Sequence, residues 1–128
     1  NNAFVGTVRG RIAPDTWIVR STVTGSRNSD FQDGARTVGF ADAALVTDQV
    51  IEYSFVEPAF WPDFPGFRPD PSVHFRHDGR ASVVWLDGHV SSEKVSHSES
   101  SGIYPLVASD YGVGWFGDVA TNELYDYD

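Results

Sequence analysis

The chain has 128 residues, enough for one domain that buries a core of its own, and we expect a single domain over residues 1–128. Its content of 41% hydrophobic and 14% aromatic residues excludes a disordered chain, and the absence of cysteine excludes disulfides and thiolate chemistry. The formal net charge of −9 disfavours binding to nucleic acid or to anionic lipid, because like charges repel. No apolar run approaches the roughly 18 residues that span a bilayer.

The first half of the chain contains four segments rich in β-branched and aromatic residues, which favour strands. They are residues 4–9, 16–23, 36–41 and 50–56. Pro14 and Asp15 predict a turn between the first two, and the polar residues 25–33 predict a surface loop. Residues 42–49 fit one helical turn or a short strand equally well. No longer window has a clear helical period, so we expect a mainly β domain.

A loop rich in proline and aromatic residues follows at residues 58–71, which hold five of the seven prolines. Such a density of proline excludes a helix interior or a central strand. The aromatic side chains of this loop are Phe60, Trp61, Phe64 and Phe67. Two interpretations stay open: these side chains pin the loop to the domain's own core, or they bind carbohydrate or a protein partner.

Residues 76–90 contain an alternating, mostly apolar run between two Asp-Gly pairs, Asp78-Gly79 and Asp87-Gly88. Asp-Gly between such runs predicts a β-hairpin, because a type I′ turn needs positive φ at both central residues. We therefore expect an antiparallel three-stranded meander of residues 72–77, 80–86 and 89–95. Within its central strand, one face should carry Ala81, Val83 and Trp85, and the other Val84 and Leu86.

The same stretch carries a family resemblance. His77 is separated by nine residues from Asp87-Gly88, and His89 follows directly. This H-x9-DG signature occurs near the C-terminus of many bacterial prepilin-like proteins, which are similar to type IV pilins and to the pseudopilins of type II secretion. The likeness extends over about residues 35–128, through the blocks ARTVGFADAAL, IEYSFVEP, SVHFRH, GWFG and NELYDYD. A signature embedded in several matching blocks is more specific than one short pattern.

The resemblance implies the globular head of a cell-envelope protein, periplasmic or at the cell surface, which assembles with other pilin-like subunits or with secretion-system proteins. Such heads belong to an α+β parent fold in which the sheet packs against an N-terminal apolar helix, and only that helix would reach the membrane. The helix is missing from this sequence, so we expect a soluble piece or a processed product. An exposed apolar strip is then expected on the sheet.

His77, Asp87 and His89 also invite interpretation as a metal or catalytic site. The meander argues against this, because six residues at about 3.3 Å each place His77 and Asp87 roughly 20 Å apart. In the structural alternative, the two Asp-Gly pairs form turns and the two histidines make hydrogen bonds at strand ends. A first loop wider than two residues would restore the ligand interpretation.

GVGWFG at residues 112–117 matches the G-x-G-x-x-G dinucleotide fingerprint. That site needs a following helix and an acidic residue about twenty residues on, whereas the chain ends eleven residues after Gly117. We expect bent-strand glycines beside packed aromatic side chains instead.

The C-terminal acidic segment offers oxygen ligands that suit calcium. They come from Asp118, Asn122, Glu123 and Asp126, and the pseudopilins that the chain resembles can hold calcium near their C-termini. The spacing is not that of an EF-hand loop, so a solvated acidic tail stays open as the alternative. No other cofactor is expected.

No motif in the sequence predicts an enzyme. A G-x-S-x-G elbow is lacking, and nothing selects Glu52 and Glu57 as a glycosidase pair. We expect a structural or assembly role. The alternatives are a carbohydrate- or protein-binding module that uses residues 58–71, and an enzyme whose acids and histidine converge in a deep pocket.

Overall fold

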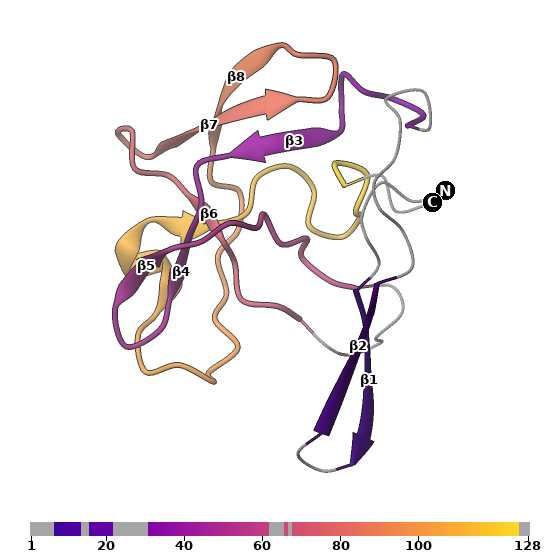
Figure 1. Ribbon diagram of the computed structural model, residues 1–128. Coiled ribbons are helices and arrows are strands. Elements are labelled where there is room, and N and C mark those ends of the chain that lie inside the picture. Colours follow the sequence, from indigo (N-terminus) through magenta and orange to yellow (C-terminus); the bar gives the residue numbers. More distant parts are fainter. Residues whose placement is uncertain (1–6, 14–15, 22–30, 62–65, 67, 126–128) are drawn as a thin grey trace. The chain divides into compact units, whose positions relative to one another are not determined.

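The computed structural model describes residues 7–13, 16–21, 31–61, 66 and 68–125 (Figure 1). The predicted turn at residues 14–15, most of the predicted loop at 25–33, Phe64, Phe67 and Asp126 lie outside this part. The chain divides into two compact units, residues 1–32 and 33–128, here called the N-terminal unit and the main unit. Both are built from short antiparallel strands, which confirms the prediction of a mainly β fold.

The N-terminal unit contains one antiparallel hairpin. Strand β1 (Thr7–Ala13) pairs with β2 (Thr16–Ser21), from Thr7 opposite Ser21 to Ala13 opposite Thr16. The register shifts between Arg11 and Ala13. Strand β2 lies within the predicted residues 16–23, and β1 continues to Ala13, beyond the predicted end at residue 9. The other residues of these two predictions, 4–6, 22 and 23, lie outside the described part.

The largest sheet of the main unit has the order β3-β7-β8, with all strands antiparallel. Its strands are β3 (Val38–Ala41), β7 (Arg80–Trp85) and β8 (Val90–Lys94). The β7–β8 hairpin and the central place of β7 agree with the sequence, but the predicted pairing of residues 72–77 with β7 is wrong. That edge of β7 is taken by β3, and beyond β3 by Asp42, whose backbone N–H donates to the carbonyl oxygen of Ser82 (3.1 Å).

The two Asp-Gly pairs form different turns. Asp78 (φ 55°) and Gly79 (φ 73°) are both left-handed, and His77 and Arg80 exchange two backbone hydrogen bonds around them, as a type I′ turn requires. At the other pair only Gly88 has positive φ (92°), so the prediction of a type I′ turn there is wrong. The loop spans residues 86–88, because the N–H of Trp85 donates to the carbonyl oxygen of His89.

Smaller pairings complete the main unit. Strand β4 (Ala44–Val46) forms a hairpin with β5 (Val50–Glu52), which settles residues 42–49 as a short strand and turn rather than a helix. Strand β6 (Val73–His74) pairs with β9 (Val113–Gly114). A 3-10 helix, η2 (Ala108–Tyr111), precedes β9. In the described part of the chain, no helix has the length and apolarity of a membrane span.

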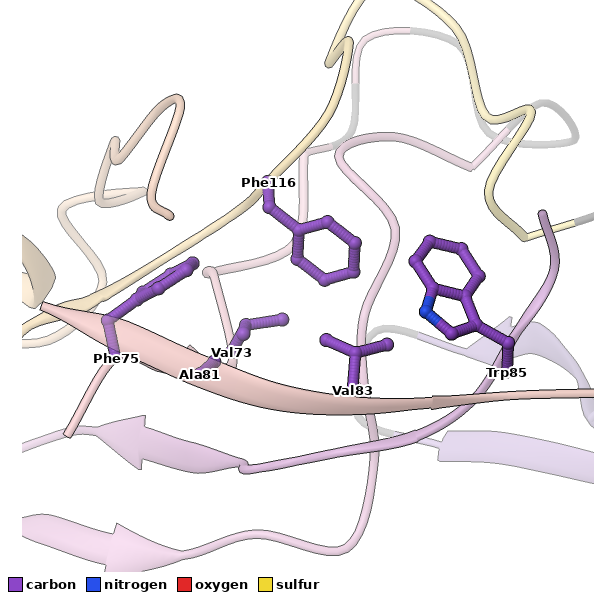
Figure 2. Packing of buried hydrophobic residues seen from close by; sticks show 6 residues of the cluster. All are labelled: Val73, Phe75, Ala81, Val83, Trp85 and Phe116. Atoms are coloured by element: carbon purple, nitrogen blue, oxygen red, sulfur yellow. The ribbon is translucent and has the colours of Figure 1, made fainter. Parts of the chain in front are cut away.

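The core of the main unit lies on one face of β7. Figure 2 shows Val83 and Trp85 pointing from β7 toward Phe116, whose ring meets the indole edge-on at 6.1 Å. The buried cluster consists of Val73, Phe75, Ala81, Val83, Trp85 and Phe116. The prediction that Ala81, Val83 and Trp85 share one face of the central strand is therefore confirmed. A second cluster, Ala44, Val46, Ala108 and Val113, joins β4 to η2 and β9.

Candidate functional site

The first end of β7 is organised around the carboxylate of Asp42, directly after β3. The Nε and Nη2 atoms of Arg76 donate to its Oδ1 atom (3.1 and 2.6 Å), and the backbone N–H of Ser82 donates to Oδ2 (2.8 Å). The Nε2 atom of His77 lies 3.1 Å from Oδ2. One carboxylate, whose side chain is only 12% exposed, therefore joins the end of β3 to β7 and to the turn before it.

Charge at this end is fixed by the same contacts. Burial acts to raise the pKa of Asp42, but the Ser82 N–H, Arg76 and His77 together hold the pKa below its usual value. The pKa of His74 is also lowered, first by burial and then by the guanidinium of Arg76. Near neutral pH the cluster therefore holds an ionised Asp42 and a neutral His74.

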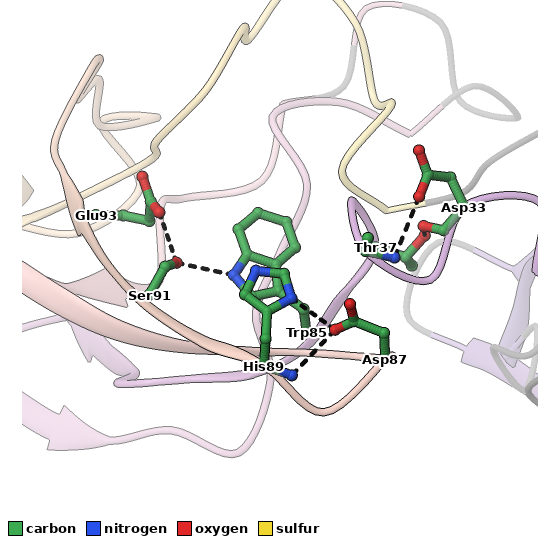
Figure 3. Close-up of polar contacts among 8 residues, drawn as sticks. Asp33, Thr37, Trp85, Asp87, His89, Ser91 and Glu93 are labelled. Carbon is green, nitrogen blue, oxygen red and sulfur yellow. Dashed lines mark hydrogen bonds and ion pairs between the residues drawn. The ribbon is translucent and has the colours of Figure 1, made fainter.

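The second end of β7 is organised around Asp87 and His89 (Figure 3). The Nδ1 atom and the backbone N–H of His89 lie 2.6 and 3.0 Å from Oδ1 of Asp87. These two hydrogen bonds lower the pKa of Asp87. The imidazole ring stacks on the indole of Trp85, with ring centres 5.5 Å apart and planes 10° from parallel. The aspartate of the signature thus fixes a histidine against the core tryptophan.

A chain of hydrogen bonds continues from Trp85 along β8. Its Nε1–H donates to Oγ of Ser91 (2.8 Å), and that hydroxyl donates to Oε1 of Glu93 (2.6 Å) (Figure 3). Asp87, His89 and Ser91 have alternate positions along the chain, which invites comparison with a catalytic triad. The hydroxyl proton of Ser91 is directed to Glu93, however, so His89 does not activate this serine.

The structure does not bring the two ends of the signature together. His77 precedes β7 and contacts Asp42, whereas Asp87 follows β7 and contacts His89. The six residues of β7 between them span roughly 20 Å at 3.3 Å per residue. Among the described residues, no three His, Asp or Glu side chains form a group suited to a metal ion.

Each glycine of GVGWFG occupies a position where the structure requires glycine. Gly112 (φ 66°) ends η2 in the left-handed region, and Gly117 (φ 75°) is also left-handed. Gly114 lies so close to a neighbouring segment that a Cβ atom would stand 2.6 Å from the carbonyl oxygen of His97. The motif therefore belongs to a tightly packed segment around β9. This agrees with the expectation of strand glycines beside packed aromatic side chains and not with a phosphate-binding loop.

The predicted calcium ligands that the structure describes have other partners. Oδ1 of Asp118 accepts the N–H of Ala120 (2.8 Å), and Glu123 pairs with Arg36 (2.9 Å). The side-chain amide of Asn122 donates to the carbonyl oxygen of Phe60 (2.7 Å). The described ligands are thus directed to three different neighbours, and the calcium site stays a prediction.

The two ends of the proline-rich loop pack on the main unit. Pro58, Ala59, Pro69 and Pro71 are buried, and Phe60 and Trp61 are half-buried. Glu57 next to the loop accepts the Nε1–H of Trp115 at its carbonyl oxygen (3.0 Å). These contacts favour the interpretation that the loop is pinned to its own core.

A shallow hollow of about 400 Å³ lies beside Asp42, and its position could not be read from the sequence because three distant segments form it. Its lining consists of Phe40, Ala41, Asp42, Ala43, Glu52, Tyr53, Ser54, Arg76, Ser82 and Val84. Asp42, Ser91 and Glu93 were likewise missed by sequence reasoning. For Asp42 the only signal was its place directly after a predicted strand.

Comparison with known proteins adds no family. The sequence matches no protein-family model, no curated protein and no solved structure. A function for this chain therefore has to be inferred from its own residues and geometry.

Proposed function

We propose that the chain is the globular head of a pilin-like or pseudopilin-like protein of the cell envelope, with a structural or assembly role rather than a catalytic one. The H-x9-DG signature and the sequence blocks around it support this proposal. The observation that carries it is the use of the signature: His77 and Asp87 stand at opposite ends of β7, and each is engaged in a contact that closes the fold.

The structural contacts at the two ends of β7 explain why a histidine stands at position 77 and an aspartate at position 87, so no catalytic role is needed to explain them. His77 lies at the type I′ turn and contacts the carboxylate that receives the Ser82 N–H, so it helps to hold β3 against β7. Asp87 accepts two hydrogen bonds from His89 and thereby orders the loop between β7 and β8. A general acid or base needs a reacting group within hydrogen-bond reach, and these side chains are occupied by structural partners.

The test is the location and assembly of the full-length protein. In cells that express an epitope-tagged copy of the natural gene, we expect the protein in the envelope fraction, periplasmic or surface-exposed. Chemical crosslinking should then join it to other pilin-like subunits or to secretion-system proteins. A protein that is found only in the cytoplasm as a monomer would contradict the proposal.

A further inference from the structure

Three apolar side chains form a row on the face of the main sheet that points away from the core. Phe40 of β3 stands opposite Val84 of β7, and Val84 stands opposite Val90 of β8. Directly opposed residues of antiparallel strands share a face, so the three side chains lie side by side. Phe40 is 74% exposed and Val90 is 65% exposed. We call Phe40, Val84 and Val90 the outer row.

The hollow beside Asp42 continues from this row. Phe40 and Val84 of the sheet line it together with residues 52–54, Asp42 and Arg76. An apolar surface that ends at polar side chains suits a ligand with an apolar part and a polar or charged part. A bare sheet face would offer only apolar contact.

The charges of the hollow select the sign of such a ligand. The guanidinium of Arg76 and the carboxylate of Asp42 compensate each other, since they lie 2.6 Å apart. Glu52 is exposed and makes no ion pair with any other described residue. The hollow therefore carries one uncompensated negative charge beside the exposed ring of Phe40, a combination that favours an organic cation.

Two basic residues at the other end of the same face disfavour a ligand that carries several positive charges. Arg80 and Lys94 stand directly opposite each other in the β7–β8 register, and neither has an ion pair within the described residues. They lie four residues along the strands from the outer row, or about 13 Å. A polybasic ligand would be repelled there, whereas a segment with a single cation would not.

We propose that this face docks a protein segment that presents one lysine or arginine side chain among apolar residues. The aliphatic stem of that side chain covers Phe40 and Val84 while its charged head reaches Glu52. The apolar neighbours cover the rest of the outer row. An uncharged apolar helix is a poorer occupant, because it would bury Glu52 without a partner. The inference stands on the outer row and the hollow alone and does not depend on the proposed function.

The test is a titration of the ¹⁵N-labelled chain with three helical peptides, each acetylated, amidated and made of alanine, leucine and glutamine around one central residue. That residue is lysine in the probe, and norleucine or glutamate in the matched peptides. We expect amide shifts confined to residues around the outer row and the hollow. The lysine peptide should bind about tenfold more tightly than the norleucine peptide, and the glutamate peptide more weakly than both.

Substitutions of exposed residues, which should not disturb the fold, test whether Glu52 causes the preference for lysine and whether Phe40 supplies the apolar contact. Glu52→Gln should abolish the advantage of lysine over norleucine, whereas Asp110→Asn removes the same charge elsewhere and should leave it unchanged. Phe40→Ala should weaken both peptides, while Ile103→Ala, which removes another exposed apolar side chain (71% exposed), should weaken neither.

Three outcomes would overturn the proposal. If no peptide bound, or if the shifts lay on another face, this surface would not be the docking site. If the lysine and norleucine peptides bound equally well, the occupant would be an uncharged apolar segment.

Discussion

The Nε2 atom of His77 lies 3.1 Å from Oδ2 of Asp42, and the same oxygen accepts the backbone N–H of Ser82 at 2.8 Å. The histidine of the H-x9-DG signature is therefore coupled to Asp42, which follows β3, rather than to the aspartate of its own signature. If the signature residues have a structural role, substitutions at these contacts should change the free energy of unfolding in ways that can be measured.

The first prediction concerns Asp42. Replacing it with alanine leaves the Ser82 N–H and the Arg76 guanidinium without their acceptor, so we expect the free energy of unfolding to fall by about 1–3 kcal/mol. Urea denaturation of the purified chain measures the change. Asp110→Ala, at an exposed position of η2, is the matched control and should alter stability by less than about 0.5 kcal/mol. Equal effects of the two substitutions would refute a structural role for Asp42.

The second prediction concerns pH. The pKa of His74 is lowered in the folded state, so the unfolded chain binds more protons once the pH falls below 6.5. Stability should therefore begin to decline below that pH. The lowered pKa of Asp42 adds a second decline below its usual value of 3.8, because its stabilising contacts are present above that pH and are lost on protonation. His74→Gln should remove the first decline and leave the second, as followed by denaturation at a series of pH values. A decline between pH 6.5 and 5 that persists in this variant would contradict the assignment.

The third prediction concerns the two ends of β7. His77 and Asp87 are far apart and share no contact, so the losses of stability in His77→Ala and Asp87→Asn should add within about 0.5 kcal/mol in the double variant. A double-mutant cycle measured by denaturation decides the point. A coupling energy well above this limit would mean that the two ends act together and would revive a shared site.

The fourth prediction concerns two glycines. A Cβ atom at Gly114 would stand 2.6 Å from the backbone oxygen of His97, so Gly114→Ala should cost about 1–3 kcal/mol through overpacking. At Gly34 the nearest atoms to an added Cβ are 3.6 Å away, and Gly34→Ala should be tolerated. Thermal denaturation compares the two variants. Similar midpoints would show that the close approach at Gly114 relaxes without cost.

Local chemistry made part of the fold predictable from sequence. Asp78 and Gly79 adopt the positive φ values that their types favour, and the alternation along β7 correctly places Ala81 and Val83 on the same face, which is buried. The partner of β7 was not predictable, because Asp42 joins the sheet through contacts with residues 34 and 40 positions later in the chain. Sequence spacing carries no signal for such a pairing.

For the candidate sites too, features set by local sequence could be predicted, whereas features set by the order of the strands could not. Turn chemistry correctly separates His77 from Asp87, since that separation follows from the length of one strand. The docking face depends on which strands are neighbours: Phe40 and Val84 meet only after β3 is placed beside β7. The hollow could therefore not be derived before the sheet order was known.

The backbone amide of Ser82 depends for its hydrogen bond on a segment that is distant in the sequence. The β7–β8 hairpin closes through a three-residue loop, so its own ladder forms from neighbouring residues. The carboxylate that protects the Ser82 amide arrives only when a segment some forty residues away has docked. Hydrogen exchange at this amide should therefore report whether the segment around Asp42 is docked on β7, although Ser82 itself is exposed.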